Sequence, residues 1–259
     1  MSPAFHEEAL RRLGVEYAPD PAAMRALTAR SSYLRIVLPK SFVEWYGMRS
    51  GIELLERNSN CDHPLPIERL GDPLQWRWPV APDCVSEGRL IFMVENQAVS
   101  VWALGLHGGD DPPVFVARDP DLGWRHCAEA FSTFVGCQVW DHTEIFDSAE
   151  PPRRILVQAQ DVPLRSDDLA FLQRSFSARA TTHGWPGNNQ YRFERGETCI
   201  LIWDGDDQAD WWITAATAGG LASVVDELRN CGGLQTSLWS NDERGTAVLE
   251  TARSDRAHQ

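Results

Sequence analysis

Four aspartates fall within seven positions of this sequence, in the stretch Asp204-Gly-Asp206-Asp207-Gln-Ala-Asp210. Carboxylate oxygens at such short spacing are the ligands that hard cations such as Ca²⁺ and Mg²⁺ prefer, so the stretch could hold a metal ion. The spacing does not match an EF-hand loop. Asp and Gly are also common turn formers, and the stretch lies between two predicted strands. We favour the alternative, a solvated hairpin turn, and predict neither a metal nor a cofactor.

Two other groups of side chains could perform acid–base or nucleophilic chemistry. His126 and Glu129 lie one helical turn apart in a predicted helix, with Asp141 and His142 shortly after, so they could act as general acid and base in a cleft. Cys137 and His142 could form a nucleophile and its base, but nothing nearby favours a lowered thiol pKa. A surface pair beside a loop histidine is the alternative. Gly-x-Ser-x-Gly, phosphate-binding glycine loops and His-Glu-x-x-His are all absent, and we predict that the protein is not an enzyme.

Acidic residues dominate the chain, which carries a net charge of −13 over 259 residues and contains a single lysine, Lys40. Residues 110–150 hold nine acidic residues and two arginines, a local balance of −7. Because negative potential speeds the encounter with a basic partner, this segment predicts a protein-binding surface. The alternative is that acidity only keeps the protein soluble. The candidate contact residues are Asp110, Asp111, Asp119, Asp121, Asp141, Glu144 and Asp147.

Composition also excludes several classes of partner and location. The sequence contains no basic run of the kind that binds nucleic acid or an anionic membrane surface. No apolar run approaches the roughly 20 residues that span a bilayer. The first residues do not resemble a secretory signal, so we expect a cytoplasmic protein. The six cysteines form no Cys-x-x-Cys pair, which argues against a zinc ribbon and favours reduced, mostly buried thiols.

Helices and a small sheet are predicted in the first half of the chain. Apolar spacing predicts helices over 5–13, 22–30 and 39–46. An apolar run and an alternating run predict strands over 90–94, 99–103 and 114–117. Their short connections predict a three-stranded antiparallel meander. Apolar residues recur at helical spacing from Trp124 to Val135, which predicts a helix over the sheet that ends at Gly136.

The pattern restarts after a Pro-rich boundary at 148–154. Strands are predicted over 155–159, 191–193, 198–203, 211–215 and 234–239. Helices are predicted from a cap at Asp167 or Asp168 to Phe176 and over 221–229, with a disordered tail from Arg253. Trp211 and Trp212 direct one ring to each face of their strand, so one ring could serve an interface or fill the core. The predicted domains are 1–147 and 148–254, with a disordered tail over 255–259.

The order of motifs over 21–142 resembles the SUKH superfamily, the Smi/Knr-like group. The residues that carry the resemblance are Leu38, Pro39, Trp45, Gly51, Pro113, Trp124, Phe131, Phe134 and Trp140. The resemblance implies an α+β fold with a central antiparallel sheet flanked by helices, here followed by a second, smaller α+β region. It also implies a protein that acts by binding other proteins.

The resulting hypothesis is a bacterial immunity protein that binds a basic toxin domain of the nuclease or deaminase type. Its carboxylates would occupy the place of substrate phosphates and occlude the active site of the toxin. One alternative is a regulatory scaffold that binds an endogenous protein. Another is a metal-dependent enzyme that uses the Asp204–Asp210 stretch.

Overall fold

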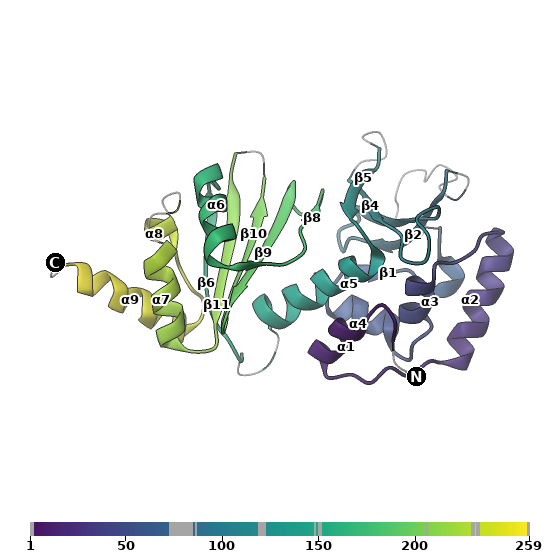
Figure 1. The fold of residues 1–259 in the computed structure, drawn as a ribbon, viewed down its shortest axis with the longest axis horizontal. Coiled ribbons are helices and arrows are strands. Elements are labelled where there is room, and N and C mark those ends of the chain that lie inside the picture. The colour runs from purple at the N-terminus through teal and green to yellow at the C-terminus, as the bar shows by residue number, and fades with distance from the viewer. Residues whose placement is uncertain are drawn as a thin grey trace. The chain divides into compact units, whose positions relative to one another are not determined.

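Two antiparallel sheets, each with its own helices and core, organise the chain (Figure 1). The computed structural model describes residues 3–72, 85, 87–118, 123–147, 149, 152–205, 207–228, 231 and 234–257. Unit 1 comprises Met1–Trp140 and Thr182–Trp185, and unit 2 comprises Asp141–Thr181 and Pro186–Gln259. The predicted α+β class is confirmed. The predicted boundary after Asp147 falls within unit 2.

Unit 1 is a five-stranded sheet with helices packed against it. Its helices are α1 (Glu7–Leu13), α2 (Pro21–Leu34), α3 (Lys40–Tyr46), α4 (Gly51–Arg57), η1 (Ile67–Arg69) and α5 (Phe131–Trp140). Its strands are β1 (His63–Pro64), β2 (Arg89–Val94), β3 (Val101–Gly105), β4 (Val114–Ala117) and β5 (Arg125–Ala128), adjacent in that order, with β8 (Thr182–His183) against β5. The predicted meander is therefore the centre of the sheet, because short connections leave consecutive strands as neighbours.

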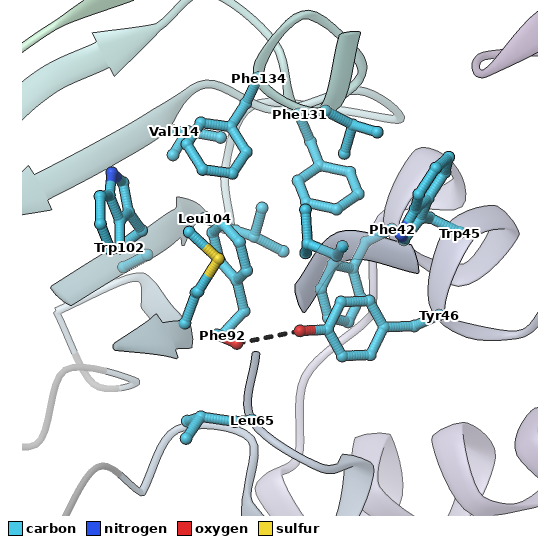
Figure 2. Close-up of a cluster of buried hydrophobic side chains, with 14 of the residues drawn as sticks. Phe42, Trp45, Tyr46, Leu65, Phe92, Trp102, Leu104, Val114, Phe131 and Phe134 are labelled. Atoms are coloured by element: carbon cyan, nitrogen blue, oxygen red, sulfur yellow. Dashed lines mark hydrogen bonds between the residues drawn. The ribbon is translucent and has the colours of Figure 1, made fainter. Parts of the chain in front are cut away.

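Aromatic side chains from two helices and one strand fill the core of unit 1. Figure 2 shows Phe42 and Tyr46 of α3 with Phe131 of α5 around Phe92 of β2. Phe42 stacks on Tyr46 at 4.1 Å between ring centroids, and Phe131 meets Phe92 edge-on at 5.4 Å. The Tyr46 hydroxyl donates a hydrogen bond of 2.9 Å to the Phe92 carbonyl, so its one polar atom is satisfied. Each buried ring contributes about 1.5–3 kcal/mol of apolar burial.

The residues that carry the family resemblance are mainly structural. Pro39 caps the N-terminus of α3, and the Pro113 carbonyl accepts a hydrogen bond from the Gly105 N–H at 2.9 Å. A Cβ atom on Gly51 would lie 1.9 Å from the carbonyl oxygen of Trp45, so only glycine fits there. Trp124 is half-buried beside β5. The others are buried in unit 1: Leu38, Trp45, Phe131, Phe134 and Trp140.

The predicted helix from Trp124 to Val135 is wrong in its first half. Residues Arg125–Ala128 form β5, which pairs with β4, and the helix starts only at Phe131. Pairing at the open edge of the sheet outweighs a helical pattern of apolar residues, because backbone groups beside a strand gain hydrogen bonds. The helix also does not stop at Gly136 but continues to Trp140. A π-helical turn, η4 (Asp141–Ile145), follows directly.

Unit 2 has a sheet covered on one face by helices. Its strands lie in the order β6 (Ile155–Val162), β11 (Ala209–Ala215), β10 (Thr198–Asp204), β9 (Asn189–Arg195) and β7 (Ser177–Ala178). Its helices are α6 (Ser166–Ser175), α7 (Ala218–Glu227), α8 (Leu234–Ser237) and α9 (Glu243–Ala257). Helix α7 packs on β10 and β11, and α8 and α9 pack on β6 (Figure 1).

Three predictions for unit 2 are corrected by the structure. Arg165, not Asp167 or Asp168, is the N-cap of α6; Asp168 instead accepts a hydrogen bond of 3.2 Å from the Arg165 backbone N–H. The strand predicted over 234–239 is helix α8, and only an isolated bridge joins Trp239 to Gln158. The tail predicted to be disordered forms α9 as far as Ala257, where packing on α7 and β6 stabilises it.

Candidate protein-binding surface

The acidic residues predicted in unit 1 divide into an exposed ion pair and a helix cap. Asp110 receives the Lys40 ammonium at 2.8 Å, and both side chains are well exposed. Asp111 accepts the backbone N–H of Ser132 at 3.0 Å and also its hydroxyl, so it caps the first turn of α5. Asp119 and Asp121 lie outside the described residues.

The acidic residues predicted in unit 2 are held by arginines of the same unit. Asp141 accepts two hydrogen bonds from Arg192, from Nε at 2.7 Å and from Nη2 at 2.6 Å. The Arg192 side chain is 2% exposed and that of Asp141 is 14% exposed. Glu144 accepts one hydrogen bond from Arg154 Nη2, and both side chains are largely buried. These two carboxylates cannot bind a partner without giving up their arginines.

Asp147 is likewise occupied, and its side chain is 6% exposed. It accepts hydrogen bonds from Arg153 Nε at 3.0 Å and from the backbone N–H groups of Ala149 and Arg153, each at 3.0 Å. Burial raises the pKa of Asp147, but the hydrogen bonds and charge of Arg153 outweigh it and hold the pKa at about 2. Of the predicted contact residues that the structure describes, Asp110 therefore has the most exposed carboxylate.

A different surface in unit 2 combines three clustered aromatic rings with carboxylates; Phe146 and Trp203 are partly exposed and Trp212 is buried. Trp203 and Trp212 lie on the sheet face opposite the apolar core residues of β10 and β11, with 4.4 Å between ring centroids. Phe146 packs on both, at 6.0 Å from Trp203 and 5.6 Å from Trp212, and it is 37% exposed. Trp211, the neighbour of Trp212, points the other way and is fully buried in the core. The alternation of a strand thus produces the aromatic cluster.

Four carboxylates lie at the adjoining end of the same sheet: Asp161, Asp204, Asp207 and Asp210. Asp210 pairs across the strands with Trp203, which places both side chains on one face. It accepts the Asp161 backbone N–H at 3.2 Å, while Asp204 accepts the Asn189 side-chain amide at 3.1 Å. Within the described residues, none of the four carboxylates forms an ion pair. We call the six residues Phe146, Asp161, Trp203, Asp207, Asp210 and Trp212 the aromatic–acidic surface; Asp204, one residue after Trp203 in β10, points to the opposite face of the sheet.

The stretch Asp204–Asp210 forms the connection between β10 and β11. The Gly205 N–H donates to the Gln208 carbonyl at 2.8 Å, which closes a tight turn. Asp206 lies outside the described residues. In the part of the chain that the structure describes, no three or more His, Cys, Asp or Glu side chains are grouped to hold a metal ion.

The structure places the predicted acid–base residues on or beside three different elements, β5, α5 and η4. His126 belongs to β5, and its Nε2 lies 3.8 Å from Glu129 Oε2 in a partly exposed pair. Cys137 is buried in α5. Burial also raises the pKa of the Cys199 thiol to about 12 and that of the Cys231 thiol to about 11. These two thiols stay protonated at neutral pH, which makes both poor nucleophiles.

Comparison with known proteins gives no match: no protein-family model, curated protein or solved structure is similar to this chain. Among the described residues, no helix combines the length and the apolar character needed to cross a bilayer.

Sequence reasoning missed the aromatic–acidic surface because charges were counted along continuous segments, and the residues of this surface are not continuous in the sequence. The surface collects residues from 146 to 212, and the carboxylate-rich stretch was treated only as a turn or a metal ligand set. One signal was present: Trp203 and Trp212 stand close to the two ends of the acidic turn at 204–210. Two strands that meet at such a turn carry the rings and the carboxylates to the same end of the sheet.

Proposed function

We propose that this protein is a non-enzymatic binding protein of the SUKH immunity type, which neutralises a basic toxin domain in the cytoplasm of the producing cell. The observation that carries the proposal is the aromatic–acidic surface. It joins the partly exposed rings of Phe146 and Trp203, which pack with Trp212, to three carboxylates that are free of ion pairs within the described residues. The motif resemblance over 21–142 supports the immunity role.

The physical argument rests on what such a surface gains from a basic partner. Aromatic side chains are enriched among the few residues that dominate binding energy, each costing about 2 kcal/mol or more when truncated. Carboxylates that lack an intramolecular cation are free to pair with lysines and arginines of a partner. A nuclease or deaminase groove that holds substrate phosphates offers that charge. Covering the groove would block the toxin sterically and electrostatically.

The experiment is a growth rescue in a sensitive host. The protein is co-expressed with the C-terminal domain of any large secreted protein encoded beside it, and rescue is scored together with co-purification. We expect rescue by the wild type and its loss in the double variant Phe146→Ala/Trp203→Ala. The matched control is Tyr33→Ala/Val37→Ala, which removes two side chains of unit 1 that are 76% and 87% exposed.

The charge half of the surface has its own pair of variants. Asp161→Asn/Asp207→Asn/Asp210→Asn should slow toxin association and weaken rescue. The triple variant Glu53→Gln/Glu68→Gln/Glu250→Gln removes the same charge from exposed positions elsewhere and should rescue like the wild type. Rescue by both triple variants alike would contradict the electrostatic part. A well-folded wild-type protein that neither rescues nor co-purifies would favour the regulatory scaffold instead.

A further inference from the structure

Three polar side chains lie buried in a row at one end of the unit 1 sheet. Val94 of β2 pairs with His63 of β1 on one side and with Val101 of β3 on the other. One position beyond these pairs, Glu95 therefore lies between Asp62 and Ser100. The Glu95 N–H donates to the Ser100 carbonyl at 2.9 Å, which continues the β2–β3 pairing to this point. Residues opposite each other across strands direct their side chains to the same face. The row therefore places two carboxylates and a hydroxyl side by side.

The two carboxylates are buried without a cation. Asp62 and Glu95 are each 4% exposed. Asp62 accepts the Asn96 backbone N–H at 3.2 Å, and Glu95 accepts the Gln97 N–H at 2.7 Å and the Val99 N–H at 3.2 Å. Within the described residues, neither carboxylate forms an ion pair with Arg, Lys or His. Adjacent buried carboxylates repel each other and lose their hydration, so a cation bound beside them would stabilise the row.

The hydroxyl of the row is an orphan. Ser100 is 0% exposed, and its Oγ atom has no hydrogen-bond partner among the described residues. Unpartnered buried hydroxyls are uncommon, and each one requires an explanation such as an absent water or ion. Since Ser100 lies opposite Glu95, its oxygen is directed to the same side of the sheet as the carboxylates. This observation is independent of the charge of the row and favours the same kind of ligand, a cation.

We infer that the Asp62–Glu95–Ser100 row binds a hard divalent cation, Ca²⁺ or Mg²⁺. The three side chains offer only oxygen ligands, which these ions prefer, and waters would complete the coordination. The turn beside the row includes Val99, which is 40% exposed. The inference goes beyond the proposed function and does not depend on it.

Isothermal titration of the EDTA-treated, full-length protein with calcium chloride, and separately with magnesium chloride, tests the inference. We expect saturable binding of at least one of the two ions, accompanied by a higher unfolding temperature. Asp62→Asn should abolish the binding, and Ser100→Ala, which keeps both carboxylates, should weaken it about tenfold. Asp207→Asn, a matched change in the exposed β10–β11 turn, should leave it unchanged.

Each outcome of the titration either supports or overturns the inference. Binding that depends on Asp62 and Ser100 but not on Asp207 supports the inference. No binding of either ion by the wild type overturns it, as does binding that Asp62→Asn and Ser100→Ala leave at full strength. If Asp62→Asn fails to fold, Ser100→Ala alone decides, because loss of one buried hydroxyl leaves the charge of the row intact.

Discussion

Replacing Asp141 by asparagine removes the negative half of the Asp141–Arg192 ion pair in unit 2. Two hydrogen bonds of 2.6 and 2.7 Å join the two side chains. In the variant, the carbonyls of Gln190 at 3.1 Å and Ala180 at 3.3 Å still accept from the Arg192 guanidinium. The buried guanidinium loses the negative charge of Asp141, while the shape of the side chain at 141 is preserved.

The size of the effect follows from burial. Breaking a buried ion pair by removing one partner costs about 3–5 kcal/mol. Because the Asp141 side chain is 14% exposed and water can reach it, the lower end applies, about 3 kcal/mol. For a chain of this size that corresponds to a fall in unfolding temperature of roughly 6–12 °C. Replacing both residues with apolar ones, Asp141→Leu/Arg192→Met, should cost less than Asp141→Asn alone, because no charge stays buried.

Urea and thermal unfolding, followed by tryptophan fluorescence and circular dichroism, measure these differences for the wild type, Asp141→Asn, Asp141→Leu, Arg192→Met and Asp141→Leu/Arg192→Met. The wild type and the last three variants form a double-mutant cycle. A coupling energy well above 1 kcal/mol in that cycle would confirm the buried pair. The opposite result is informative as well. If Asp141→Asn unfolds within about 1 °C of the wild type, the pair is not structural, and Asp141 returns to the set of candidate partner contacts.

Three further predictions concern protonation, backbone fit and thiols. Burial lowers the pKa of His6 below its ordinary 6.5, so the contribution of neutral His6 to stability should be complete above about pH 6.5 and fall as the pH drops below it. Urea midpoints measured across this range test the pH dependence, and His6→Gln should reduce it. Gly51→Ala brings a Cβ atom to 1.9 Å from the Trp45 carbonyl oxygen. It should cost about 1–3 kcal/mol in urea unfolding, and an unchanged midpoint would contradict the packing described. Iodoacetamide at about pH 8 should label exposed Cys61 in the native protein but not buried Cys231, because burial raises the pKa of the Cys231 thiol to about 11. Equal labelling of the two cysteines in mass spectra would contradict the burial of Cys231.

The central sheet of unit 1 and the hairpin strands of unit 2 could be predicted because their patterns are local. The continuous apolar run at β2 and the two-residue alternation at β3 are both local strand patterns. Pro39 and Gly47 bracket α3 as predicted, since proline and glycine restrict where a helix can begin and end. These elements depend on residues close together in the sequence.

Elements that depend on partners far away in the chain were predicted incorrectly. The apolar residues within Arg125–Ala128 recur at helical spacing with the apolar residues that follow, yet this segment forms the edge strand of a sheet. Residues Leu234–Ser237 look like a strand, but they form a short helix that packs against β6, while Trp239 just after it bridges to Gln158 at the outer edge of β6. In both cases tertiary packing outweighs local pattern.

The candidate site was even less accessible to sequence reasoning. Net charge located an acidic segment, but it could not show that Asp141 is paired with an arginine 51 residues away or that Asp111 caps a helix. Pairing of this kind is a property of the folded state. The carboxylates of the aromatic–acidic surface, which form no ion pair among the described residues, lie instead at 161–210, beside rings whose shared face only the sheet geometry reveals.

The most direct test of the account is the affinity of the co-purifying toxin domain for three forms of this protein. Those forms are the wild type, Phe146→Ala/Trp203→Ala and the control Tyr33→Ala/Val37→Ala, compared by surface plasmon resonance after circular dichroism has shown equal folding. The account predicts that the first double variant loses affinity about thirtyfold or more, while the control binds like the wild type. Equal affinity of all three forms would contradict the assignment of the aromatic–acidic surface as the site of partner binding.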